Sequence, residues 1–79
     1  MKYNDYNDYD RREVHGMANI ARIRIQKGLS QQQLANKSGV HRVALAKLEA
    51  GERPIENIRL STALALADAL GVDVHDLLN

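Results

Sequence analysis

The strongest constraint on how this chain can fold is the short spacing between two helix-forming segments. The stretch "SQQQLANKSGVHRVALAKLEAG" covers residues 30–51 and is interrupted at Gly39. Because only about three residues connect the two segments, the helices must cross at a steep angle and touch. The crossing needs a small side chain in the first helix, where Ala35 lies, and a positive φ at the turn, which glycine adopts readily.

The second segment has the apolar pattern that such a crossing requires. At about 100° per residue, three apolar residues lie on one side of a helix: Ala44, Leu45 and Leu48. Leu34 and Val40 can pack against this side, so the pattern predicts a helix-turn-helix at about residues 31–50. The opposite side carries a mixture of cations and small apolar groups: Arg42, Val43, Ala46 and Lys47. A face that is only solvated is usually more polar than this.

Helix signals continue on both sides of this unit. Ser30 followed by Gln33 forms a capping box, and Asp73 is suited to cap a last short helix. Glycines are placed to end the other helices: Gly28, Gly39, Gly51 and Gly71. We expect five helices, which begin near Met17, Gln31, Arg42, Ser61 or Thr62, and Asp73. With a loop at "GERPIENIRL" and no strand pattern, the chain is expected to form one all-α domain over residues 17–79.

Charge is segregated along the chain, although the net charge is only +1. Residues 17–59 carry eight cations and three anions, which is a net charge of +5. Residues 1–16 carry three cations and four anions, and residues 60–79 carry three anions and no cation. A basic centre between acidic ends favours a polyanionic partner.

Several classes of function lack the residues they need. The chain has no cysteine, so it has no disulfide or thiolate metal site, which fits a cytoplasmic protein. It has no apolar run of membrane-spanning length and no signal-peptide pattern, so we expect no membrane association. The histidines are far apart, at His15, His41 and His75, without metal-ligand spacing. We therefore expect no catalytic residues, no metal and no cofactor.

The first 16 residues form a separate N-terminal tail with a repeated Tyr-Asn-Asp sequence. Asn and Asp favour turns over helix, which indicates a solvated, weakly structured arm. The alternative is an extra helix or a docking segment that uses the tyrosines at positions 3, 6 and 9. An arm that enters the DNA minor groove is less favoured, because Arg11 and Arg12 are its only clustered cations.

The segments "GLSQQQLANKSGVHRVALAKLEAGERPI" and "LALADALGV" resemble the Cro and phage-repressor family, also called the XRE family. The resemblance covers residues 18–78. It implies a five-helix, lambda-repressor-like DNA-binding domain whose second and third helices form the DNA-binding unit. It also implies that the protein binds double-stranded operator DNA as a homodimer.

The resemblance assigns roles to particular residues. The first residue of the second helix, Gln31, is expected to hydrogen-bond a DNA phosphate near a helix N-terminus. The exposed face of the third helix is expected to read bases in the major groove: Arg42, Val43, Ala46 and Lys47. Helical periodicity places these four on one face independently. Arginine is suited to guanine, and the methyl groups of Val and Ala are suited to that of thymine, while Lys47 can contact a base or a phosphate.

The family also often pairs an Arg of the first helix with the Glu that follows the third helix's last Leu. These positions are Arg24 and Glu49 here. The implied role is a partly buried structural ion pair, so neither residue is expected to read bases. The alternative is an exposed pair that contributes only about 0–1 kcal/mol.

Two features depart from the family pattern. His41 occupies the N-cap of the third helix, where Ser or Thr is usual and caps better. His41 is instead expected to donate to a phosphate, which would make DNA binding pH-sensitive near neutrality. The connection "GERPIENIRLST" is also long, and Arg53 within it is expected to contact a phosphate. The alternative is a solvated loop in which Ile55 and Ile58 fill the core.

These features lead to an expected sequence-specific DNA-binding regulator of transcription. It would act as a homodimer on a pseudo-palindromic operator, and repression is favoured over activation. The dimer surface is expected near the C-terminus at Leu77 and Leu78, because adjacent residues of a short helix cannot both face the core. The alternative is an antitoxin or other protein-interaction module of the same fold, whose main partner is a protein bound through the N-terminal tail.

Overall fold

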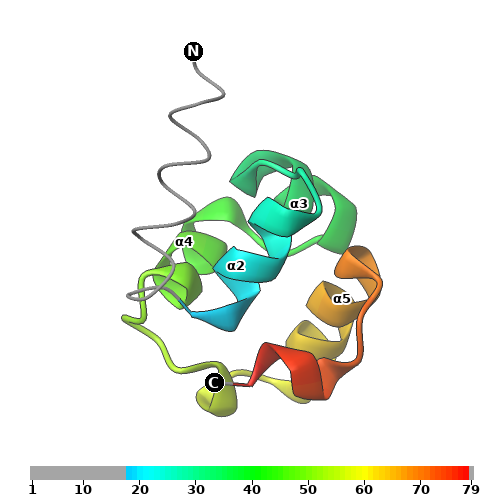
Figure 1. Ribbon diagram of the computed structural model, residues 1–79. Helices are drawn as coiled ribbons and strands as arrows, with labels where there is room; N and C mark the ends of the chain where they lie inside the picture. The colour runs from blue at the N-terminus through cyan, green and yellow to red at the C-terminus, as the bar shows by residue number, and fades with distance from the viewer. Residues whose placement is uncertain (1–17, 79) are drawn as a thin grey trace.

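The computed structural model describes residues 18–78, and within them the chain folds into four α-helices and two short 3-10 helices (Figure 1). They are, in chain order, α2 (Asn19–Gln26), α3 (Gln31–Ser38), α4 (Arg42–Glu49), η2 (Ile55–Asn57), α5 (Leu60–Leu70) and η3 (Val74–Leu77). The all-α prediction is confirmed, since this part of the chain contains no strand. The N-terminal tail and its possible roles lie outside the described residues.

The turn between α3 and α4 has the conformation that its sequence predicts. The Gln33 N–H donates to Ser30 Oγ at 3.0 Å, and the Ser30 N–H donates to Gln33 Oε1 at 2.8 Å, which completes the capping box. Gly39 ends α3 with φ of 79°. Ser38 closes the turn, because its hydroxyl accepts the Val40 N–H at 3.1 Å.

The last helical segment differs from the expected fifth α-helix and is the 3-10 helix η3. Asp73 caps it as predicted, since its carboxylate accepts the His75 N–H at 2.8 Å. The backbone N–H of His75, followed by its ring, holds the pKa of Asp73 below its usual value. Only one turn fits between Asp73 and the extended Leu78, and a 3-10 turn closes its hydrogen bonds with fewer residues than an α-turn.

Helix α5 begins at Leu60, before the predicted start at Ser61 or Thr62. Its N-cap residue, Arg59, provides no capping side chain, but its carbonyl accepts the Ala63 N–H at 3.0 Å. A helix that packs along its length on a core does not need a capping side chain to form. Ser61 and Thr62, which were expected to begin the helix, therefore lie within its first turn.

The core takes one fully buried aliphatic residue from each of five elements: Ile20, Leu34, Leu45, Leu66 and Leu77. Helix α3 packs against α4 and α5, and η3 packs against α2 and α5. In Figure 1, α4 and α5 lie on opposite sides of the bundle. Ile55 of η2 is buried and Ile58 packs against the same core, so the long connection is held against the domain. None of the helices between residues 18 and 78 has the length and apolar composition needed to cross a membrane.

Leu77 is a core residue, which corrects its expected place in a dimer surface. Its exposed fraction is 0%, whereas that of Leu78 is 43%. Leu77 therefore cannot contact a second chain while the domain is folded. Of the two leucines, only Leu78 remains available for such a contact.

Replacing Gly39 with valine is expected to destabilise the domain through the backbone. Nothing lies within 4 Å of a Cβ built at Gly39, so no clash contributes. A β-branched residue at this positive φ is strained, and we expect Gly39→Val to lower the free energy of unfolding by about 1–3 kcal/mol. Gly39→Asn is the matched control, since asparagine tolerates this conformation better. Urea unfolding measures both, and equal losses would contradict the explanation.

Candidate nucleic-acid interface

Helix α4 divides its side chains between the core and the surface. Leu45 and Leu48 are buried, whereas the side chain of Val43 is 54% exposed. Of the other candidate reading residues, Arg42 and Lys47 are exposed and Ala46 is half-buried. This face offers guanidinium and ammonium donors beside methyl groups, and the major-groove edges of base pairs present acceptors and a methyl group.

A shallow surface hollow next to this face brings three basic residues together. His41, Lys47 and Arg53 line it, with Val43 and Glu52 among the other lining residues. The chain turns back after α4, because the N–H groups of Glu52 and Arg53 donate to the Lys47 carbonyl at 3.0 and 3.3 Å. Two of the residues predicted to contact phosphate, His41 and Arg53, therefore lie in one hollow beside a predicted reading residue.

His41 caps α4 with its imidazole ring. Nδ1 accepts the Val43 N–H at 3.2 Å. A ring nitrogen that accepts is unprotonated, so the neutral ring carries its proton on Nε2. Neutral His41 can thus cap α4 and still offer one N–H to an anion, whereas a fully protonated ring would lose the cap.

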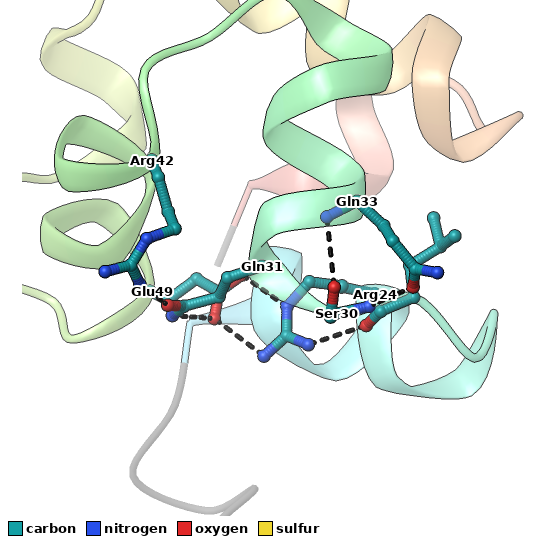
Figure 2. A network of polar contacts seen from close by, with 7 residues as sticks. Arg24, Ser30, Gln31, Gln33, Arg42 and Glu49 are labelled. Carbon is teal, nitrogen blue, oxygen red and sulfur yellow. Dashed lines mark hydrogen bonds and ion pairs between the residues drawn. The ribbon is translucent and has the colours of Figure 1, made fainter.

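A buried ion pair joins α2 to the C-terminal end of α4 (Figure 2). Arg24 Nε lies 2.7 Å from Glu49 Oε2, and Arg24 Nη2 donates to Glu49 Oε1 at 3.0 Å. The exposed fractions of Arg24 and Glu49 are only 6% and 5%. Arg24 Nη1 also donates to the Leu29 carbonyl at 2.7 Å. One guanidinium of α2 thus contacts both the end of α4 and the turn before α3. The pair is buried and bidentate, and it is not the exposed pair that was the alternative.

Gln31 extends this network to the exposed face of α4. Its Nε2 donates to Glu49 Oε1 at 3.0 Å, and its Oε1 accepts from Arg42 Nη1 at 3.4 Å. Figure 2 shows these contacts running from Arg24 through Glu49 and Gln31 to Arg42. Sequence reasoning placed Gln31 near a phosphate and missed this bridge, because no local pattern reports a contact across 18 positions.

The described residues contain no group of three or more His, Cys, Asp or Glu side chains that could hold a metal ion. Every buried side-chain nitrogen or oxygen among them has a hydrogen-bond partner. A ligand therefore meets polar side chains at the surface of this part of the chain, and on α4 these include Arg42 and Lys47.

Comparison with known proteins identifies the family. A helix-turn-helix family model matches residues 20–77, which is more than half of the chain. The chain belongs to the XRE-type helix-turn-helix family. This family has a DNA-binding transcription-regulator fold and is not a typical enzyme family.

Two relatives support this membership of the XRE-type family. Control protein C.SmaI of Serratia marcescens is 43% identical over 60 residues, which is 76% of this chain and 68% of the relative. The HTH-type transcriptional regulator y4dJ of Sinorhizobium fredii, whose function is uncharacterized, is 41% identical over 63 residues, which is 80% of this chain and 77% of the relative. Both matches cover most of each protein.

Replacing Arg24 alone is expected to destabilise the domain strongly. Arg24→Met leaves the Glu49 carboxylate buried without its cation, and removing one partner of a buried pair costs about 3–5 kcal/mol. The double variant Arg24→Met/Glu49→Met removes both charges and is expected to recover most of that loss. Chemical denaturation of the wild type, Arg24→Met and the double variant measures their free energies of unfolding. A double variant no more stable than Arg24→Met would show that the unpaired charge is not the cause.

Proposed function

We propose that this protein binds specific sequences of double-stranded DNA and regulates transcription. The observation that carries the proposal is the exposed face of α4, where Val43 is 54% exposed between cations on a helix whose other face is buried. The net charge of +5 over residues 17–59 supports a polyanionic ligand. The names of the two relatives, a control protein and a transcriptional regulator, support a role in regulation.

The proposed binding mode places α4 in the major groove. Arg42 donates to a guanine, the methyl groups of Val43 and Ala46 contact thymine methyls, and Lys47 contacts a base or a phosphate. His41 and Arg53 contact the phosphate backbone from their common hollow. Gln31 donates to a phosphate through the Nε2 hydrogen that Glu49 does not use.

The protein acts as a homodimer in this proposal, with each copy on one half of a pseudo-palindromic operator. The dimer surface is assigned to the exposed leucines of α5, Leu60 and Leu64, which are 68% and 48% exposed, together with Leu78. Leu60 and Leu64 are four apart on one helix and therefore neighbours on its surface. In this proposal the protein represses transcription, because a bound dimer can block the promoter without any further domain. The proposed location is the cytoplasm, where the protein would have access to DNA.

Selection of bound sites from random double-stranded DNA tests this function. We expect two related half-sites whose centres are about 10 base pairs apart, or a multiple of this spacing. Arg42→Ala is expected to weaken binding to the selected site by about 1–3 kcal/mol and to relax the preference at one base pair. Arg22→Ala is the control, because it removes the same kind of cation from α2. Arg22 lies in a different hollow, lined by Val72 and Asp76 and by no residue of α4, so its loss should leave the base preference unchanged. Binding without any sequence preference would overturn the proposal.

Replacing Leu64 with aspartate tests the dimer surface. A charge in an apolar contact opposes association, so Leu64→Asp is expected to be monomeric in sedimentation equilibrium. Its affinity for a full operator should fall far more than its affinity for a half-site, because the linked second contact is lost. Gln26→Asp adds the same charge at an exposed position of α2, a helix that carries none of these leucines, and should leave the dimer intact. A dimeric Leu64→Asp would place the interface elsewhere.

A further inference from the structure

The first turn of α4 is closed by an imidazole ring that can change its charge. His41 Nδ1 accepts the Val43 N–H at 3.2 Å, and the His41 carbonyl accepts the Leu45 N–H at 3.0 Å. Val43 is 54% exposed, and Arg42, which is also exposed, precedes it. The ring bond therefore lies within the turn that carries two of the candidate reading residues.

This cap depends on the protonation state of the ring. Neutral imidazole has one acceptor nitrogen, whereas imidazolium has none, because both of its nitrogens carry a hydrogen. Imidazole changes between the two forms close to neutral pH, and the change removes the partner of the Val43 N–H. A serine or threonine hydroxyl at an N-cap accepts the same kind of bond without titrating in this range. The Leu45 bond to the backbone carbonyl is unaffected, so the effect is confined to the first turn.

The surroundings of the ring are mostly cationic. The charged side chains that line hollows together with His41 are Arg42, Lys47, Glu52, Arg53 and Arg59. From α3, the polar side chains in these hollows are the uncharged Gln32 and Asn36. A protonated ring adds a further positive charge to this surface, which attracts the phosphates of any DNA sequence. Protonation thus strengthens a sequence-independent attraction while it removes a bond that orders the reading turn.

We infer that His41 is a positioning residue whose neutral form holds Arg42 and Val43 in the orientation that reads bases. The inference rests on the proposed function, because it concerns base discrimination by α4. A phosphate that accepts from Nε2–H supports the same neutral form, since Nδ1 then remains an acceptor for the Val43 N–H. Discrimination between DNA sequences is therefore highest where the ring is neutral and falls in acid, whereas the affinity for DNA of any sequence rises in acid.

DNA titrations at two pH values test the inference in a protein with a single histidine. This parent protein is the full chain with His15→Gln and His75→Gln, so His41 is its only imidazole. It is titrated at about pH 8 and at about pH 5.5, where an ordinary histidine is mostly neutral and mostly protonated. The DNA molecules are the selected site and the sites altered at the base pair whose preference Arg42→Ala relaxes. The discrimination ratio compares two sites bound by one protein, so a lower folded fraction cancels.

Two replacements of His41 in this parent separate the cap from the charge. We expect the ratio of the parent to fall by about threefold to tenfold between the higher and the lower pH, as for the loss of a helix cap. His41→Ser supplies a cap that does not titrate, so its ratio should stay high at both pH values. His41→Ala has no cap, so its ratio should be low at both.

Three results would overturn the inference. A constant ratio in the parent, with an affinity that rises in acid for every site, would leave His41 as a phosphate contact only. A full ratio in His41→Ala, or an equal fall with pH in His41→Ser, would show that the cap does not set discrimination.

Nitrogen NMR of the DNA-free parent checks the cap itself, so that a failure of the proposed function is recognised separately. At the higher pH we expect the ring proton on Nε2, and the Val43 amide signal should shift as the ring titrates. A ring proton on Nδ1 would overturn the inference without any DNA measurement. A parent that binds all sites equally at both pH values would instead overturn the proposed function.

Discussion

The ion pair between Arg24 and Glu49 is the interaction on which the placement of α4 depends. It is buried, it is bidentate, and its guanidinium also holds the Leu29 carbonyl just before α3 begins. Three segments therefore meet at one charged group: α2, the turn before α3, and the end of α4. Because an unpaired charge is strongly disfavoured at such a site, each partner requires the other. The direction in which the exposed side of α4 faces follows from this junction and from the leucines beneath it.

Features that depend on neighbouring residues were predictable from the sequence, and features that depend on tertiary packing were not. Ser30 and Gln33 form their capping box, and Gly39 has the positive φ that the short turn requires. The 3-10 form of the last turn and the early start of α5 depend on how these two segments pack in the folded domain. Local propensity carries neither kind of information.

The same limit applies to the candidate site. Helical periodicity was sufficient to place Leu45 in the core and Val43 on the surface of α4. Periodicity could show that Leu77 and Leu78 face different ways, but only the packed structure shows which one is buried. The bridge made by Gln31 was also invisible, because its partners come together only after α3 has folded against α4.

The separation of buried from exposed positions along α4 has a consequence for how such a protein can diverge. Changes at Leu45 or Leu48 alter whether the chain folds, whereas changes at Val43 or Lys47 alter mainly what the folded surface offers to a ligand. Descendants of one gene can therefore acquire new target preferences while keeping the same scaffold. Position 42 is the exception, since its side chain contacts Gln31, and a new residue there is compatible only with a neighbour that accommodates it. Positions 31 and 42 are thus expected to change together across lineages.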